Sequence, residues 1–218
     1  EDFPNYNEWA NVDDGSCDIY STDVFGCTDP YSFSYNSNAN IDNGDCVMMH
    51  VGQQAHGGIV FYVDETGEHG LVAALEDLGG YYEWGCMAIN VLGADGTGIG
   101  EGYQNTVDIV NSDCMLGGWE VISEEYYEGI NAAQAALNYI SEGYNDWFLP
   151  SKDELLEMYN TIGNGGIDGN IGNFIEGWYS SSSEYNDNNA WRTIFTDGFT
   201  RGTEWKIYSS NVRPIRSF

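Results

Sequence analysis

The chain has 218 residues, of which 42% are hydrophobic and 15% aromatic, so it can bury a core and is not expected to be disordered. It holds 35 acidic and 6 basic residues, which gives a formal net charge of −29 at pH 7. This charge argues against nucleic acids and anionic membranes as partners, and no apolar run approaches the roughly 18 residues that a membrane span requires. The excess acid would attract divalent cations, although it is equally compatible with a role in solubility alone.

The first 49 residues differ from the rest, because they are rich in Asn, Asp, Ser and Tyr and contain an internal repeat. The segment Tyr6–Cys17 aligns without gaps with Tyr35–Cys46, and seven of the twelve paired positions are identical. The second copy opens with Cys27, whereas the first would need its opening cysteine three residues before Glu1, so we expect the chain to start in the middle of a repeat. Residues 1–49 are therefore interpreted as a separate irregular region of Cys-bounded repeats, the first of them incomplete.

Residues 50–218 are predicted to form a single α+β domain. The run Gly58–Asp64 is rich in β-branched and aromatic residues, and a turn at 65–68 separates it from a second apolar run, His69–Leu75. These patterns predict two strands. Glycines and polar residues dominate 79–105, which is typical of a long loop.

Two helices are predicted in the second half of this domain. One is the Ala-rich segment Gly129–Ile140, and the other begins after Ser151, where Glu154 three positions on completes a capping box. A short buried strand is predicted at Trp147–Pro150, and a second loop at Gly163–Gly177. The remaining predicted strands are Trp178–Ser183, Ala190–Thr196 and Asn211–Phe218.

Several motifs of this domain occur in an order that resembles a known family of bacterial surface domains. They include the run Gly57–Ala74, the sequence DWFLPSKDEL at 146–155 and the closing VRPIRSF at 212–218. Further matches are Asn105-Thr106, Tyr179–Glu184 and Ala190-Trp191. Together they resemble the C-terminal domain family of collagen-like bacterial adhesins. The resemblance implies a C-type-lectin-like fold in its formylglycine-generating-enzyme variant, with two helices and a small antiparallel sheet.

The N-terminal repeats resemble short Cys-bounded, Asp/Asn-rich modules that occur in tandem on secreted bacterial proteins and are commonly assumed to bind calcium. Calcium takes six to eight oxygen ligands, which closely spaced Asp and Asn side chains around a Gly turn can supply. The alternative is that the Asp-Gly and Asn-Gly pairs only form turns. An EF-hand is excluded, because its ligand pattern is missing. The candidate calcium ligands are Asn7, Asp13 and Asp14 in the first copy and Asp29, Asn36, Asn38, Asp42 and Asp45 in the second.

The five cysteines indicate disulfides and therefore an oxidising, extracellular location. Cys27 with Cys46 would close the complete repeat, and Cys86 with Cys114 would hold down the long loop. Cys17 is then left over. Zinc is not favoured, because the cysteine spacing contains no C-x-x-C pair and the histidines are not paired.

Aromatic side chains offer a second kind of candidate site, since sugars stack on aromatic faces, although most of these residues fit a core or an interface better. No catalytic constellation is evident: Ser151 follows a proline at a helix start, which indicates a cap and not a nucleophile. The residues considered for glycan or interface contacts are Tyr81, Tyr82, Trp84, Tyr126, Tyr127, Trp178, Tyr185 and Trp191.

The sequence therefore predicts a non-enzymatic structural or adhesive module, secreted or held at the bacterial surface. It has no basic-then-apolar leader, so we expect any secretion signal to have been removed. The preferred hypothesis is a subunit of a surface fibre built from copies of itself, with the N-terminal repeat docked on a neighbour near Cys17. The alternative is a glycan-binding adhesin domain, whose ligand would not be a sulfated polysaccharide because of the net charge. Processing from a longer precursor would also explain the incomplete first repeat.

Overall fold

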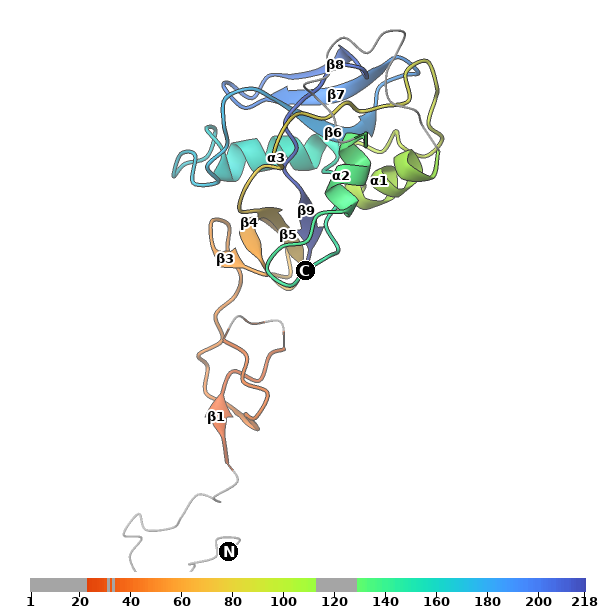
Figure 1. The fold of residues 1–218 in the computed structure, drawn as a ribbon. Coiled ribbons are helices and arrows are strands. Elements are labelled where there is room, and N and C mark those ends of the chain that lie inside the picture. Colours follow the sequence, from red (N-terminus) through yellow and green to blue (C-terminus); the bar gives the residue numbers. More distant parts are fainter. Residues whose placement is uncertain (1–22, 31, 33, 113–128) are drawn as a thin grey trace, which may run out of the picture. The chain divides into compact units, whose positions relative to one another are not determined.

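The computed structural model describes residues 23–30, 32, 34–112 and 129–218 (Figure 1). The chain divides into two compact units, Glu1–Met49 and His50–Phe218.

The described part of the N-terminal unit has little regular structure. Strands β1 (Phe25–Gly26) and β2 (Ile41–Asp42) form one short parallel pair. Side chains supply much of the remaining order, as when Ser34 Oγ donates to the carbonyl oxygen of Asp45 at 2.8 Å and accepts from the amide of Val47 at 2.9 Å. This arrangement is consistent with a segment too poor in apolar residues to form a core of its own.

The C-terminal unit begins with an antiparallel sheet whose strand order is β3-β4-β5-β9. Strand β3 covers Gln54–Ala55, β4 Gly58–Val63 and β5 Gly70–Ala74, so the predicted hairpin is confirmed. All five residues of β5 are buried, as expected of a strand covered on both faces. Strand β9 (Ile215–Ser217) pairs with β5 and is shorter than the predicted closing strand.

A second antiparallel sheet has the order β6-β7-β8. Strand β6 covers Trp178–Glu184 and β7 Asn189–Ile194, close to the two predicted strands. The serines at 180–183 are all buried inside β6, as the strand prediction requires. Strand β8 (Thr200–Trp205) was not predicted, because its largely polar sequence carries no apolar alternation.

Three helices lie among the described residues: α1 (Gly102–Asn111), α2 (Ala132–Leu137) and α3 (Lys152–Ile162). The capping box of α3 is confirmed, since Ser151 accepts from the Glu154 amide and the Glu154 carboxylate accepts from the Ser151 amide. Helix α2 is shorter than its prediction. Helix α1 was missed, because its first four residues lie in the segment assigned to a loop. The predicted strand before α3 is reduced to one bridge, between Phe148 and Ile215.

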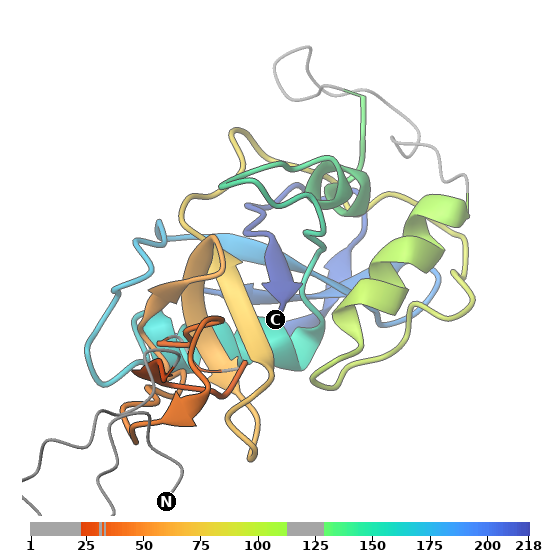
Figure 2. The same ribbon diagram turned by 90° about the horizontal axis from the view of Figure 1, so that it is seen from below.

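Helix α3 forms the centre of the C-terminal unit. It packs against β4 on one side and against β6 and β7 on the other, so that it lies between the two sheets (Figure 1). Seen from below, the sheet of β4, β5 and β9 lies in front of α3, with α1 to one side (Figure 2). Buried side chains from all three layers form the main core, among them Phe61, Leu155, Met158, Tyr179 and Phe195.

The fold class is therefore α+β, with mixed helices and antiparallel sheets. Two details of the prediction need correction for the described residues: three helices are present instead of two, and two antiparallel sheets instead of one. Strand residues outnumber helical residues in this part of the chain. No helix among the described residues is long and apolar enough to span a membrane.

Candidate functional site

A pocket of about 640 Å³ opens on the C-terminal unit, within the size range of small-molecule sites. Its walls come from the segment that follows β5, the 171–175 loop and the segment leading into β9. Aliphatic side chains cover much of the lining. The polar side chains that line it are Gln54, Glu76, Asp77, Asn173, Asn211 and Arg213.

A network of three side chains lies behind one wall of this pocket, to which two of its members, Asp77 and Arg213, contribute. Arg213, whose side chain is 1% exposed, donates from Nε to Asp77 Oδ1 at 2.7 Å. The second carboxylate oxygen of Asp77 accepts from the hydroxyl of Tyr179 at 2.7 Å. Burial, and after it the hydrogen bond to Asp77, raises the pKa of Tyr179, so its hydroxyl stays protonated and acts as a donor. Both charges of the pair are thus fixed in place.

The remaining contacts of the Arg213 guanidinium leave one nitrogen available. Nη1 donates to the carbonyl oxygens of Ala74 at 3.0 Å and Gly172 at 2.8 Å, and the ring of Phe174 lies 4.2 Å from the central carbon. Nη2 makes no hydrogen bond to the residues that the structure describes. Because Arg213 lines the pocket, the pocket is where the two Nη2 hydrogens can find partners.

The rim of the pocket includes Tyr81, one of the predicted glycan or interface residues, which is 44% exposed. Its neighbour Tyr82 is half-buried and donates to the carbonyl oxygen of Gly79 at 2.9 Å. For Trp84 the prediction of a glycan or interface contact is wrong. Its side chain is 1% exposed, donates from Nε1 to the carbonyl oxygen of Ser181 and belongs to the core. A sugar cannot reach its face.

Three other predicted aromatic residues, Trp178, Tyr185 and Trp191, do not line the pocket. Tyr185 is 50% exposed and packs edge-to-face on the half-buried Trp191, with ring centres 5.2 Å apart. Trp178 is half-buried at the start of β6. Tyr126 and Tyr127 fall outside the described residues.

Three further aromatic residues, missed by sequence reasoning, are about half exposed at and beside β8. Phe199 precedes the strand, Trp205 ends it, and Tyr208 follows after a turn; their exposed fractions are 52%, 50% and 51%. Tyr185 lies over the same strand, because a Cβ placed on Gly202 would come within 2.6 Å of its ring. We call Tyr185, Phe199, Trp205 and Tyr208 the β8 aromatic set. In the described sheet, β8 is an edge strand.

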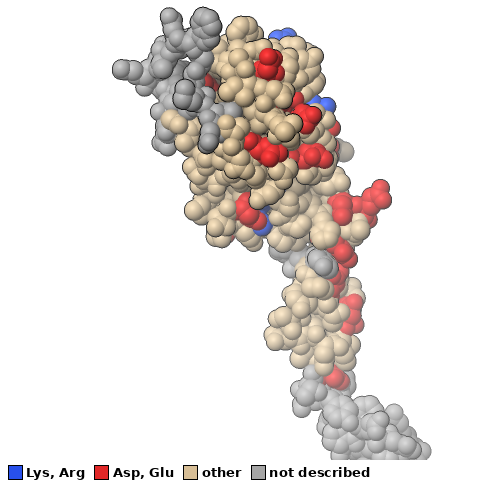
Figure 3. All heavy atoms as spheres, turned by 90° about the vertical axis from the view of Figure 1, so that its right-hand side faces the viewer, with Lys and Arg blue, Asp and Glu red and all other residues tan. Residues whose placement is uncertain are grey.

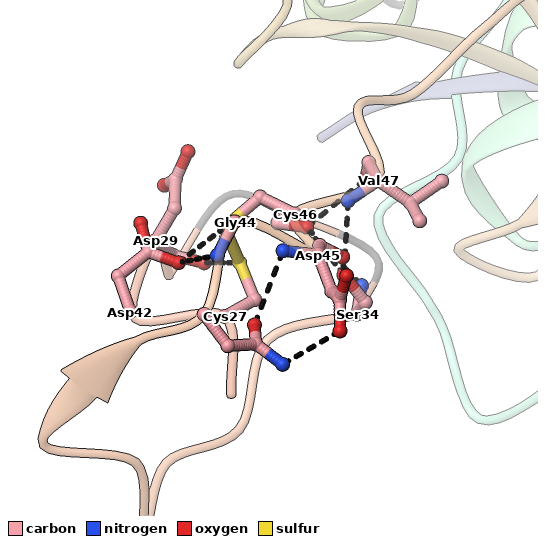
Figure 4. Close-up of a disulfide and its surroundings, with 10 residues drawn as sticks. Cys27, Asp29, Ser34, Asp42, Gly44, Asp45, Cys46 and Val47 are labelled. Carbon is pink, nitrogen blue, oxygen red and sulfur yellow. Dashed lines mark hydrogen bonds between the residues drawn. A yellow bond between two sulfur atoms is a disulfide. The ribbon is translucent and has the colours of Figure 1, made fainter. Parts of the chain in front are cut away.

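Three of the five calcium candidates of the second repeat, Asp29, Asp42 and Asp45, lie around a disulfide, as Figure 4 shows. Asp42 Oδ1 accepts from the Gly44 amide at 2.9 Å, and Asn43 Oδ1 accepts from the Asp45 amide at 3.1 Å. Asn36 Oδ1 accepts from the Asn38 amide in the same way. These hydrogen bonds are typical of turns, which the sequence left open as the alternative to calcium ligation.

Among the described residues, no group of three His, Cys, Asp or Glu side chains is placed to hold a metal. Asp29 lies near this disulfide in the complete repeat. Asn7, Asp13 and Asp14 fall outside the described residues. Calcium binding therefore remains a prediction that rests on the sequence pattern.

The expected disulfide between Cys27 and Cys46 is present, with an S–S distance of 2.04 Å. Cys86 is buried and disulfide-bonded. Its expected partner Cys114 falls outside the described residues, as does Cys17, so the second pairing stays a prediction.

The distribution of charge makes the surface more acidic than the composition alone suggests. Figure 3 shows acidic side chains spread over the visible face, with small areas of Lys and Arg on the C-terminal unit. The reason is that most bases are used inside the fold, where each faces a carboxylate, a carbonyl oxygen or an aromatic ring. The buried bases are Arg192, Lys206, Arg213 and Arg216.

No protein-family model matches the chain, and a search of curated proteins found no relative.

Proposed function

We propose that this chain is a non-enzymatic structural and adhesive module of the bacterial cell surface, and that it forms a fibre with copies of itself. The observation that carries the proposal is the β8 aromatic set on an edge strand. An edge strand presents unpaired backbone groups that can pair with another chain. Half-exposed Trp, Tyr and Phe side chains are typical of protein interfaces.

We further propose that the C-terminal unit has a C-type-lectin-like fold, as its motifs imply. The pairing of β9 with β5 supports this, because it joins the end of the unit to its beginning, with the second sheet and the helices inserted between. The motif residues also have structural roles. Trp147 is fully buried, Ser151 caps α3, and Arg213 and Arg216 of the closing motif hold Asp77 and Asp146.

An extracellular location fits the Cys27–Cys46 disulfide and the acidic surface. Like-charged copies repel each other, so assembly needs either screening by salt or bridging by a divalent cation. Calcium bound by the repeats would meet that need at the millimolar concentrations found outside cells.

Assembly is tested by sedimentation and electron microscopy of the full chain in millimolar calcium. We expect filaments or concentration-dependent oligomers, and we expect Trp205→Ser to weaken them. Tyr103→Ser is the matched control, because Tyr103 is a similarly exposed aromatic residue, at 53%, on α1. Monomers at every concentration, or equal effects of both substitutions, would contradict the proposal.

Glycan binding is the second candidate function. The pocket favours it, because the lining combines an exposed aromatic ring with several amide and carboxylate groups. The two functions are compatible, since the β8 aromatic set does not line the pocket.

A further inference from the structure

We propose that the pocket beside Asp77 and Arg213 binds an uncharged saccharide, recognised by its hydroxyl groups. This inference rests on the second candidate function and gives it a site and a ligand class. It begins from two polar atoms of residues that line the pocket, one a donor and the other an acceptor, that keep unused hydrogen-bonding capacity among the described residues.

The donor is Nη2 of Arg213, whose side chain is 1% exposed and which makes no hydrogen bond from that nitrogen to the described residues. The acceptor is Oδ1 of Asn211. This residue is 4% exposed and donates from Nδ2 to the carbonyl oxygen of Trp178 at 3.1 Å. In the part of the chain that the structure describes, its Oδ1 has no partner. Neither of these two atoms is fully enclosed by the described residues. Polar groups need hydrogen-bond partners, so both atoms can bind a ligand or water from the pocket.

A hydroxyl group fits this pair, because it can accept from Arg213 and donate to Asn211 at the same time. Further groups on the lining extend the pattern to neighbouring hydroxyls: the amides of Gln54 and Asn173 and the carboxylate of Glu76. The half-exposed ring of Tyr81 supplies an apolar face, which a pyranose ring can cover. Polyhydroxylated molecules combine these two requirements.

The charges of the lining select against a charged sugar. The charge of Arg213 is balanced by Asp77, whose Oδ1 lies 2.7 Å from Arg213 Nε. The carboxylate of Glu76 therefore gives the pocket lining a net charge of −1. A sulfate or carboxylate on the ligand would be placed beside these acids on a chain whose net charge is −29. Bringing like charges together in this way costs binding energy, so the neutral sugar is preferred.

The test needs a variant that closes the pocket and leaves the buried network intact, because Arg213→Met would leave Asp77 uncompensated and endanger folding. Gly79→Trp meets this need. Gly79 lines the pocket, its φ is outside the left-handed region, and a Cβ there would have no atom within 4 Å. Gly98→Trp is the matched control, because Gly98 is equally unstrained, has only Glu101 nearby at 3.9 Å and does not line the pocket.

Saturation-transfer NMR with the full chain then compares cellobiose, lactose and N,N′-diacetylchitobiose with a sulfated heparin disaccharide. We expect at least one neutral disaccharide to bind. The Gly79→Trp substitution should weaken the affinity for that disaccharide about ten-fold or more, whereas Gly98→Trp should leave the affinity unchanged. Tyr81→Ala should weaken it as well. Tighter binding of the sulfated sugar would overturn the ligand class. Binding that survives Gly79→Trp would overturn the site while glycan binding itself stands. If none of these sugars binds, both the inference and the glycan-binding candidate fail, whereas the assembly proposal is unaffected.

Discussion

Replacing Lys206 with Met removes the positive charge from an ion pair that is enclosed by the C-terminal unit. The Lys206 side chain is 0% exposed and its partner Glu184 is 2% exposed. The ammonium group also donates to the carbonyl oxygen of Ile89 at 2.7 Å and lies 4.5 Å from the centre of the Trp84 ring. Burial lowers the pKa of Lys206, and the carboxylate of Glu184 opposes that shift.

The expected cost follows from what the substitution leaves behind. Glu184 would remain buried and charged, and its remaining donors among the described residues would be the amide of Val91 and the side chain of Asn90. Removing one partner of a buried ion pair costs about 3–5 kcal/mol of unfolding free energy. In Lys206→Met with Glu184→Gln, both charges are gone, so this double variant should lose clearly less than the single one.

Urea unfolding followed by tryptophan fluorescence measures these differences. The matched control is Lys152→Met, because Lys152 forms a partly exposed pair with Asp153, with side chains 24% and 41% exposed. Exposed pairs contribute about 0–1 kcal/mol. Equal losses for the two single variants would refute the reasoning, and so would a double variant that is less stable than Lys206→Met.

The hydrogen bond from Arg216 holds the pKa of Asp146 in the folded protein below its ordinary value of 3.8. The ionised Asp146 therefore stabilises the fold fully above pH 3.8, and this contribution is lost as the pH falls through the lower pKa of the folded protein. Asp146→Asn should therefore reduce the loss of stability between about pH 4 and pH 2, which urea midpoints across that range would show; an unchanged acid profile would contradict it. Calorimetry of the full chain should show calcium uptake at about 0.1–1 mM, weakened by Asp42→Asn, and no uptake would exclude calcium. Non-reducing peptide mapping with a non-tryptic protease should recover Cys86 linked to Cys114, whereas any other partner would disprove the pairing.

Local sequence signals predicted the elements whose reasons lie within a few residues. The capping box at Ser151 and Glu154 depends on a spacing of three positions, so it can be read directly. The hairpin of β4 and β5 has apolar runs around a turn, where Asp64 Oδ1 accepts from the amides of Thr66 and Gly67. The pairing of Cys27 with Cys46 followed from the repeat that they close.

The missed elements have polar sequences whose burial depends on distant partners. Helix α1 has no side-chain cap at Glu101, and its buried face includes Asn105 and Thr106. Thr106 is satisfied by the carbonyl oxygen of Leu149, and Asn105 Nδ2 by that of Gly96. Such polar residues predict a loop when they are read without these partners.

The sequence alone determined that the chain is acidic, that it holds two distinct regions and that aromatic and Asp/Asn-rich segments are its candidate sites. Only the tertiary structure decided which of these residues can meet a ligand. Asp77 and Arg213 are 136 positions apart and come together because β9 returns to pair with β5. The same packing encloses Trp84 and leaves Tyr81 at the rim of the pocket. Exposure and long-range contact depend on how the strands are ordered in the sheets, and no local pattern encodes that order.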